Sequence, residues 1–370
     1  MKQTTIKEIN EYKSKSIDPR KEPETVFEMY SVPAYSTGHP EYLSGEQIAS
    51  NKVIVEKNDI LLCKINPRIN RVWVVQDESE KQNIASSEWI VIRTKKYNPE
   101  YLAWYFQSPK FKQLMVSEVT GIGGSLTRAQ PKRVANYPVP NIEREKQDEI
   151  VKRLNLLHDS IQKRKEEIQL FDELIKARFV EMFGDPGTPG QRYPTDKLGN
   201  VAFVKSSHRV FTTEFVEKGI PFFRGTEIGI LAEGGIPKDP FYITEKKYKE
   251  LASDESKPLV GDLLMPSICN KGQVWMVDTE KPFYYKDGRV LCISPNRNIF
   301  DSKYLQFYLK LRTEIEYPKL GSGSTFAEFK IFQLKELEVD LPPKYMQERF
   351  KNFIMQVDKS KFLYLRKDML

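Results

Sequence analysis

The sequence lacks the long apolar runs that mark exported or membrane-spanning chains. Its first residues, Met-Lys-Gln-Thr-Thr-Ile, contain no apolar stretch of signal-peptide length. No later run approaches the roughly 18 apolar residues that a membrane helix requires. Cysteine is also scarce: Cys63, Cys269 and Cys292 are odd in number and far apart, which indicates reduced thiols rather than a disulfide framework. We therefore expect a cytoplasmic protein without a membrane partner.

Motifs for nucleotide and metal chemistry are missing as well. There is no Walker A motif and no GxGxxG, because Gly219 and Gly225 have the wrong spacing and no lysine follows them. The three histidines stand beside no residues at metal-ligand spacing, and no CxxC pair exists. We therefore expect no metal, no cofactor and no catalytic residue in this chain.

One segment resembles a catalytic loop but lacks the residue on which that loop depends. Residues 341–345, Leu-Pro-Pro-Lys-Tyr, are similar to the Asp/Asn-Pro-Pro-Tyr loop of adenine methyltransferases. Leu341 stands where that loop needs a polar side chain to hold the amino group of the base. We interpret the prolines instead as the entry to a helix.

The composition is that of a folded chain with room for two or three domains. Of its 370 residues, 39% are hydrophobic and 29% are charged, which distinguishes it from a disordered chain. The net charge of +7 is compatible with nucleic-acid binding but does not establish it, since many proteins of other function are equally basic.

A long helix is the strongest local pattern. Between Asn141 and Pro186, apolar residues recur at steps of three and four, which places them on one helix face. Asn141 is a suitable N-cap and Gly184 begins a stop signal, so a helix of roughly 60 Å is predicted from Glu143 to Met182. It is either one long core helix or, as its narrow stripe and charged remaining faces favour, a spacer that packs on a partner helix. The stripe residues expected to pack on a partner are Ile150, Leu154, Leu157, Ile161, Ile168, Phe171 and Ile175.

Short sequence elements recur about 200 residues apart. Residues 59–62 match residues 262–265 at an offset of 203, and both are apolar after a leading aspartate. Residues 72–75 match residues 274–277 at an offset of 202, and both contain a tryptophan among apolar residues. The constant order and near-constant offset predict two copies of one unit, in which strands and short helices form a globular domain.

The predicted helices take part in the same repetition. Gln147 and Gln347 lie 200 residues apart, and each stands near the start of a helix that follows a globular domain. The second helix carries Phe350, Ile354 and Val357 on its apolar stripe, and we expect them to pack on a partner helix in the same way.

Basic and small polar residues on predicted loops are the candidate DNA contacts. An arginine binds a guanine edge through two hydrogen bonds, whereas lysines and backbone amides hold phosphates. Serine- and glycine-rich loops let the backbone approach a sugar-phosphate chain closely. The candidates in the first half are Lys64, Arg68, Arg71, Ser125, Thr127 and Arg128. The candidates in the second half are Lys205, Arg209, Arg224, Thr226, Lys271, Ser322 and Ser324.

The end of the long helix resembles a known family. Residues 177–186, Ala-Arg-Phe-Val-Glu-Met-Phe-Gly-Asp-Pro, are similar to the central region of type I restriction–modification specificity subunits. The entry to each helix is also similar, with a proline before a glutamine, from Pro140 to Gln147 and from Pro342 to Gln347. Together with the two-copy layout, the resemblance covers essentially the whole chain.

The resemblance implies an α+β protein with a pseudo-twofold internal repeat. Two mixed α/β target-recognition domains would be joined by two long antiparallel coiled-coil helices. The expected boundaries are 1–140 for the first domain, 141–185 for the first spacer helix, 186–341 for the second domain and 342–370 for the second helix. The second helix departs from the family pattern, because it is short and lacks a Phe-Gly-Asp ending.

The resemblance also implies a non-catalytic subunit that binds double-stranded DNA. Each domain would read one half of a bipartite target, while the helices set the spacer and dock DNA adenine methyltransferase subunits. S-adenosylmethionine, ATP and Mg would belong to those subunits and to a restriction/translocase subunit. Three alternatives stay open: the specificity subunit of a methylation-only or other non-type-I system, a DNA methyltransferase or nuclease that acts itself, and a coiled-coil scaffold unrelated to DNA.

Overall fold

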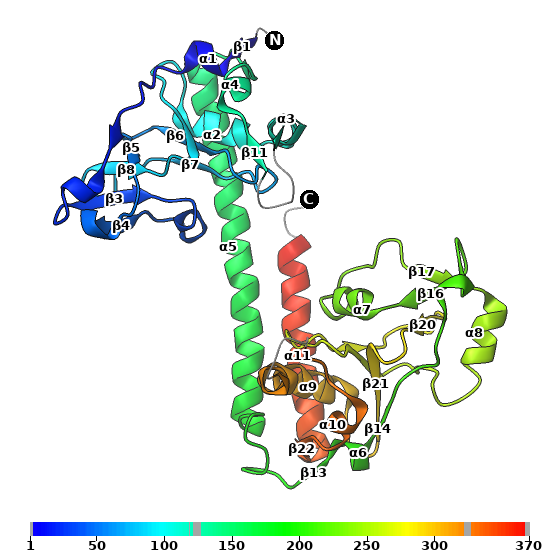
Figure 1. The fold of residues 1–370 in the computed structure, drawn as a ribbon. Coiled ribbons are helices and arrows are strands. Elements are labelled where there is room, and N and C mark those ends of the chain that lie inside the picture. The colour runs from blue at the N-terminus through cyan, green and yellow to red at the C-terminus, as the bar shows by residue number, and fades with distance from the viewer. Residues whose placement is uncertain (1–2, 118, 121–126, 322–326, 367–370) are drawn as a thin grey trace. The chain divides into compact units, whose positions relative to one another are not determined.

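A computed structural model of the chain describes residues 3–117, 119–120, 127–321 and 327–366, with the side chains of 119–120 and 362–366 left out (Figure 1). The chain divides into two compact units, Met1–Arg164 and Lys165–Leu370, which we call unit 1 and unit 2.

Cys63, Cys269 and Cys292 are buried, free thiols. Within the described ranges, no helix combines the length and the apolar character that crossing a membrane requires.

Unit 1 combines small sheets with short helices. Its strands are β1 (Gln3–Thr5), β2 (Ser16–Ile17), β3 (Val26–Tyr30), β4 (Glu41–Ser44), β5 (Lys52–Ile54), β6 (Ile60–Cys63), β7 (Val72–Val74), β8 (Asn83–Ala85), β9 (Trp89–Ile92), β10 (Val119–Thr120), β11 (Arg128–Ala129) and β12 (Pro138–Pro140). Its helices are α1 (Ile6–Ile9), α2 (Pro99–Gln107), α3 (Pro109–Ser117), α4 (Pro131–Val134) and the first part of α5 (Arg144–Phe183). One sheet has the strand order β2-β5-β8-β3-β4 and another has the order β7-β6-β9, while β1 pairs with β12 and β10 with β11.

Strand β6 is the centre of unit 1. Its side chains alternate between two faces of the sheet, as a strand requires. Ile60 and Leu62 pack in one buried cluster with Leu102 of α2, and Leu61 packs in another with Trp73 of β7. A short apolar run is therefore buried on both sides, which explains why the sequence pattern identified this strand correctly.

A glutamine near the start of α5 connects that helix to α2. Asn98 caps α2, because its Oδ1 accepts hydrogen bonds from the backbone N–H groups of Glu100 at 2.9 Å and Tyr101 at 3.3 Å. The backbone N–H of Asn98 donates to Oε1 of Gln147 at 2.8 Å, and Nε2 of Gln147 donates to the carbonyl of Ile142 at 2.7 Å. Gln147 is buried, so these bonds fix the start of α5 on the body of unit 1.

Unit 2 also combines small sheets with helices. Its strands are β13 (Thr195–Lys197), β14 (Ala202–Lys205), β15 (Phe215–Val216), β16 (Ile220–Phe223), β17 (Phe241–Ile243), β18 (Leu263–Pro266), β19 (Trp275–Met276), β20 (Tyr284–Tyr285), β21 (Val290–Pro295) and β22 (Glu338–Asp340). Its helices are the last part of α5, α6 (Leu198–Val201), α7 (Gly225–Ala232), α8 (Glu245–Leu251), α9 (Ser302–Glu316), α10 (Ile331–Lys335) and α11 (Lys344–Arg366). The sheets have the orders β14-β21-β18-β19 and β15-β17-β16-β20, and β13 pairs with β22.

A second buried glutamine connects α11 to α9. Asp301 caps α9, accepting from the backbone N–H groups of Lys303 at 2.9 Å and Tyr304 at 3.3 Å. The backbone N–H of Asp301 donates to Oε1 of Gln347 at 2.8 Å, and Nε2 of Gln347 donates to the carbonyl of Pro342 at 2.8 Å. The start of α11 is thus fixed on unit 2 by the same set of bonds that fixes α5 on unit 1.

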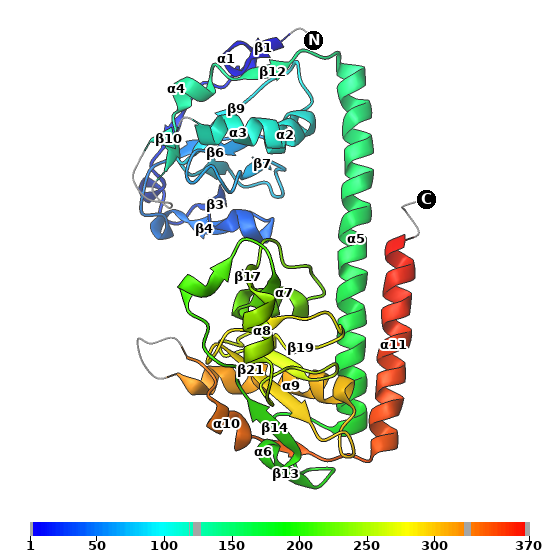
Figure 2. The ribbon, with the colours of Figure 1, turned by 90° about the vertical axis from the view of Figure 1, so that its right-hand side faces the viewer.

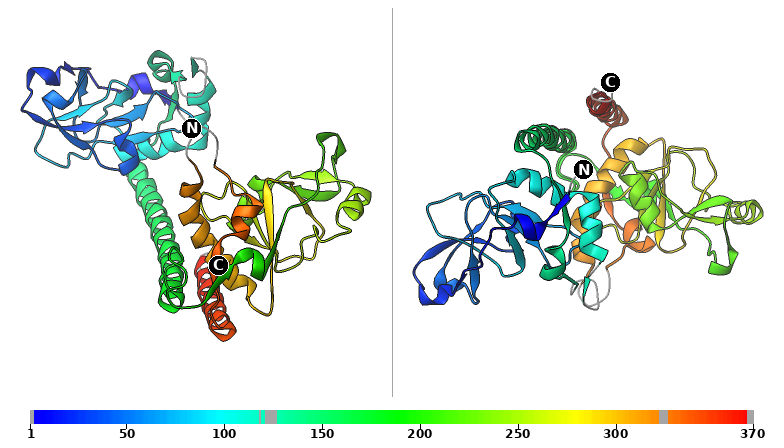
Figure 3. Two further views of the ribbon diagram at one scale, coloured as in Figure 1. Left: turned by 60° about the horizontal axis from the view of Figure 1, so that its bottom comes forward. Right: turned by 90° about the horizontal axis from the view of Figure 1, so that it is seen from above.

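The last part of α5 packs against α11 inside unit 2 (Figures 2 and 3). The rings of Phe179 and Phe350 lie 5.3 Å apart, and Lys361 pairs with Asp172 at 2.5 Å. Higher numbers on α11 therefore face lower numbers on α5, so the two helices run antiparallel here. Helix α5 ends at Phe183, directly before Gly184, whose φ of +91° is a conformation that favours glycine.

The long helix is confirmed, since α5 continues from Arg144 to Phe183, but its stripe is buried only near its ends. In unit 1, Ile150 packs against the core and Leu154 is half-buried, whereas Leu157 and Ile161 are 61% and 54% exposed. In unit 2, Ile168 is half-buried. The stripe residues in or against the core of unit 2 are Phe171, Ile175, Phe350, Ile354 and Val357.

Candidate nucleic-acid interface

In unit 1, the loop between β6 and β7 and the segment around β11 lie together. The backbone N–H of Asn66 donates to the carbonyl of Thr127 at 2.8 Å, and that of Ala129 donates to the carbonyl of Lys64 at 2.8 Å. Asn66 and Asn70 adopt positive φ angles of 44° and 52°, which asparagine tolerates better than most residues. The predicted contacts Lys64, Arg68, Arg71, Thr127 and Arg128 are thereby brought onto two neighbouring segments.

Glu88 sits between two of these basic residues. Arg128 pairs with it at 3.2 Å, and Nζ of Lys64 lies 3.8 Å from its carboxylate while donating to the carbonyl of Ser87 at 2.7 Å. Arg68 is exposed and Arg71 is half-buried, whereas the side chain of Thr127 is enclosed by the protein. Arg68 is thus the predicted arginine of this loop that is best placed to reach a ligand.

In unit 2, the predicted contact Lys205 lies beside a buried carboxylate and is itself mostly covered. Its side chain is only 10% exposed and lies 3.7 Å from the carboxylate of Asp262. Asp262 is buried and accepts a hydrogen bond from the backbone N–H of Leu259 at 3.0 Å, which closes the turn before β18. Lys205 therefore neutralises a buried carboxylate, and little of it reaches the surface.

Two further predicted residues of unit 2 are exposed and lie apart from each other. Arg209 pairs with Asp287 at 3.1 Å and is 69% exposed. Lys271 lines a pocket of about 560 Å³ together with Asp172 of α5 and Lys310 of α9. The predictions at Ser125, Ser322 and Ser324 fall outside the described residues.

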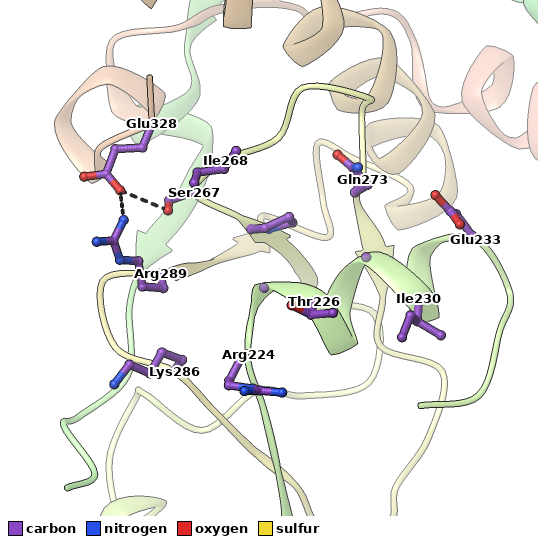
Figure 4. Close-up of a pocket in the computed structure, with 13 residues that line it drawn as sticks. Arg224, Thr226, Ile230, Glu233, Ser267, Ile268, Gln273, Lys286, Arg289 and Glu328 are labelled. Atoms are coloured by element: carbon purple, nitrogen blue, oxygen red, sulfur yellow. Dashed lines mark hydrogen bonds and ion pairs between the residues drawn. The ribbon is translucent and has the colours of Figure 1, made fainter. Parts of the chain in front are cut away.

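A pocket of about 850 Å³ in unit 2 brings together predicted and unpredicted residues (Figure 4). The predicted Arg224 and Thr226 line it from the start of α7. Gln273, Lys286 and Arg289, which sequence reasoning missed, line it as well. The Asp-Gly turn between β20 and β21 is the signal that could have identified the last two, because basic residues that flank a turn are usually at the surface. The remaining lining residues are Gly225, Gly229, Ile230, Glu233, Pro266, Ser267, Ile268 and Glu328.

Arg224 is held firmly by its neighbours. Its Nε and Nη2 donate to the two carboxylate oxygens of Glu227 at 3.1 Å and 2.7 Å, and its guanidinium lies 4.6 Å from the ring centre of Phe241. Burial raises the pKa of Glu227, but the hydrogen bonds from Arg224 outweigh burial, so the pKa of Glu227 is lowered overall. The pair stays charged and fixes the start of α7.

Arg289 and Glu328 lie next to each other at one edge of the same pocket (Figure 4). Its Nη1 donates to the carboxylate of Glu328 at 2.5 Å, and the hydroxyl of Ser267 donates to the same oxygen at 3.3 Å. Lys330 also forms a close ion pair with Glu328, and this hydrogen bond, opposed by burial, lowers the pKa of Glu328. The carboxylate is therefore ionised at neutral pH and held from three sides.

The pocket has the character of a recognition surface. Among the residues that the structure describes, no group of three His, Cys, Asp or Glu side chains is placed to hold a metal ion. What the pocket presents is a set of fixed hydrogen-bond donors and acceptors beside apolar surface from Ile230 and Ile268. Such a surface suits a polar, partly apolar ligand such as the edge of a base pair.

The sequence of unit 2 matches a known protein family. The model for the type I restriction modification DNA specificity domain matches residues 194–365. The resemblance to type I specificity subunits drawn from the sequence is confirmed, and the pocket with Arg224 and Arg289 lies within the matched residues.

Solved structures with a similar fold extend over nearly the whole chain. One belongs to work on complex assembly and conformational transition of the type I R-M system; it is 20% identical, with a TM-score of 0.55 over 98% of this chain and 92% of that chain. Another is the crystal structure of the type I restriction–modification system S subunit from M. genitalium, 13% identical, with a TM-score of 0.54 over 99% of this chain and 91% of that chain. These likenesses establish a shared fold. No curated protein sequence matches the chain.

Proposed function

We propose that the chain is a non-catalytic, sequence-specific DNA-binding subunit of a type I restriction–modification complex. The observation that carries the proposal is the match of residues 194–365 to the DNA specificity domain family. In this proposal units 1 and 2 each contain one target-recognition domain, with the boundaries predicted from the sequence, and each domain reads one half of a bipartite site. The basic, hydrogen-bonding surfaces around Arg68 and Arg289 would face the DNA.

Paired features of the two units support an internal repeat. The buried Gln147 and Gln347 bind the capped starts of α2 and α9 through bonds of equal length. The turn before β6 is closed by Asp59, which accepts from the backbone N–H of Glu56 at 2.8 Å, as the turn before β18 is closed by Asp262. A repeat of whole hydrogen-bond arrangements is hard to obtain without duplication of a unit.

The helices would act as spacer and docking surface. Antiparallel packing of α11 on the last part of α5 supports the predicted coiled-coil pair. Leu157 and Ile161 are exposed on α5, and apolar residues in such positions suit a helical partner. We propose DNA adenine methyltransferase subunits as that partner, together with a restriction/translocase subunit that joins the complex. S-adenosylmethionine, ATP and Mg would then serve the partner subunits.

Sequencing of DNA modification in strains with and without the gene tests the proposal. We expect adenine methylation at one bipartite motif to disappear when the gene is deleted, while other modification persists. In a full type I system, deleting the gene for the restriction partner should leave the motif methylated and abolish restriction of foreign DNA. A methylation-only system would methylate the motif but show no such restriction from the start. A purified chain that binds S-adenosylmethionine or methylates DNA without partners would overturn the non-catalytic assignment.

A further inference from the structure

The cations that line the unit 2 pocket each have a carboxylate beside them. Three basic side chains reach it, and each lies within 4 Å of a carboxylate. The pairs are Arg224 with Glu227 at 2.7 Å, Lys286 with Asp287 at 3.7 Å, and Arg289 with Glu328 at 2.5 Å. Asp287 also pairs with Arg209 and Glu328 with Lys330, but the carboxylates that lie beside the three cations, together with Glu233 in the lining, disfavour a phosphate. A base edge is neutral and needs fixed donors and acceptors, so the pocket fits a base better than a backbone phosphate.

The two arginines differ in what they have left to donate. Arg224 uses both Nε and Nη2 on Glu227, and its guanidinium lies close to the ring of Phe241. Arg289 gives only Nη1 to Glu328, and its Nε and Nη2 have no hydrogen-bond partner among the described residues. Its side chain is 60% exposed. Recognition of guanine requires two N–H groups of one guanidinium directed at O6 and N7. Arg289 can supply them from its whole Nε–Nη2 edge, whereas Arg224 keeps only Nη1 and the second N–H of Nη2 and is less exposed, at 44% against 60%.

Glu328 is built to orient Arg289. Its side chain is 20% exposed and is fixed by the hydroxyl of Ser267 and by Lys330. A guanidinium bound at one nitrogen to a fixed carboxylate loses less freedom when it meets a base edge, which favours binding.

We propose that Arg289, oriented by Glu328, recognises a guanine in the half-site read by unit 2. This inference rests on the proposed function and specifies one contact within it. Gln273 and the apolar side chains of Ile230 and Ile268 line the same pocket and would contact the neighbouring base pair. Arg289 is the residue that discriminates the base, and Glu328 is a positioning residue.

Unit 1 contains a matching ion pair with the charges exchanged. The backbone N–H of Lys64 donates to the carbonyl of Glu88 at 3.1 Å, as that of Ser267 donates to the carbonyl of Arg289 at 2.9 Å. Glu88 pairs with Arg128 at 3.2 Å, so in unit 1 the arginine lies on the facing segment. The same backbone frame therefore accepts the arginine in either place, and this predicts that the pair in unit 2 can be reversed without loss of folding.

The experiment uses the chain assembled with its methyltransferase partners. The duplexes carry the mapped target, and every position of each half-site is substituted in turn. The variants are Arg289→Lys, Glu328→Gln, the double exchange Arg289→Glu with Glu328→Arg, and the control Lys249→Ala. The control Lys249→Ala removes a similarly exposed cation, which lies on α8 and pairs with Glu245 at 2.9 Å. Thermal unfolding of each complex confirms that it is folded.

We expect Arg289→Lys to weaken binding of the mapped target by roughly 10- to 100-fold and to relax the requirement at one G·C pair of a single half-site. Glu328→Gln should cause a smaller loss at the same pair. The double exchange should fold but prefer a different base there, and Lys249→Ala should behave as the wild type.

Two results would overturn the inference while leaving the proposed function intact. One is a uniform loss over all sequences with a weaker salt dependence, which is the behaviour of a phosphate contact. The other is a double exchange that restores the wild-type target and affinity, since the pair would then be structural only. If the wild-type complex selected no sequence at either half-site, the proposed function itself would fail, and the inference with it.

Discussion

Glu88 in unit 1 and Arg289 in unit 2 stand at corresponding places in their sheets and carry opposite charges. The carbonyl of Glu88 accepts a hydrogen bond from Lys64, and the carbonyl of Arg289 accepts one from Ser267, at 3.1 Å and 2.9 Å. Each side chain then forms an ion pair with a residue of the facing segment. The backbone hydrogen bond is thus the same while the sign of the charge at one position differs, and this difference is what the proposed reading of two different half-sites would require.

Modular reading predicts the result of a domain exchange. Replacing residues 1–140 by the equivalent part of a relative should change one half of the target and leave the other half as it is, because residues 186–341 are untouched. Mapping the methylated motif before and after the exchange provides the measurement. A change in both halves, or in neither, would contradict independent reading by the two domains.

The exposed arginine of the β6–β7 loop gives a second prediction. If Arg68 reads a base, Arg68→Ala should cost about 1–3 kcal/mol of binding free energy and relax one position of the site. If Lys271 binds a phosphate, Lys271→Ala should instead weaken all sequences alike and lower the salt slope by about one. Titrations of matched and mismatched duplexes at several salt concentrations distinguish these outcomes. Affinity and salt slope unchanged in both variants would place the DNA on another face.

The length of α5 should set the distance between half-sites. Four residues inserted between Arg164 and Lys165 add about 6 Å and a little over one turn, so the apolar stripe stays nearly in phase. At about 3.4 Å per base pair, we expect a spacer longer by one or two base pairs and unchanged half-sites. Methylation of duplexes whose spacer varies by single base pairs measures this.

Two inserted residues are the matched control for the same helix. They rotate the part of α5 from Lys165 onward by roughly 200° relative to the part before it, so the two halves of the apolar stripe no longer lie in phase. This variant should therefore assemble and methylate worse than the four-residue insertion. An unchanged spacer preference after the four-residue insertion would refute the role of α5 as a ruler.

The buried glutamines should matter for stability. Gln347 is fully buried and bonds to the N–H of Asp301 and to the carbonyls of Ile299 and Pro342. Gln347→Leu leaves these buried groups unpaired, so we expect a loss of about 2–4 kcal/mol in the free energy of unfolding. Chemical denaturation measures it, and Glu348→Ala, at the exposed next position, should have little effect. A wild-type midpoint in Gln347→Leu would mean that water replaces the side chain.

Much of the fold was predictable because it depends on local patterns. Each of the successful signals determines structure only over the few residues around it. These signals are the apolar runs at β6 and β18, the proline at the start of α2 and the stripe of α5. The matching helix starts were predictable because Gln147 and Gln347 stand at the same place in the two helices, and each bonds to the capped start of a neighbouring helix. The positions along α5 at which the apolar stripe changes from buried to exposed were not predictable, because they depend on which other parts of the chain pack against the helix.

The candidate site was harder to predict, because its residues meet only in three dimensions. Arg289 gains its role from Glu328, which is 39 residues away in the chain. Lys205 is an ordinary basic residue in the sequence, yet Asp262, far from it in the chain, draws it into the protein. Residue type alone therefore singled out Arg224 and Thr226, which line the pocket, and omitted Lys286 and Arg289, which line it as well.

The exposed part of the α5 stripe affects how the chain behaves before it is assembled. Leu156, Leu157 and Ile161 are 63%, 61% and 54% exposed, so a newly made chain presents adjacent apolar side chains to water on one helix. Such a surface is what chaperones and proteases bind, and it drives self-association at high concentration. If the proposed partner subunits cover this stripe, a cell that made the chain in excess of them would clear the surplus, and the supply of partner would limit how much of the chain survives.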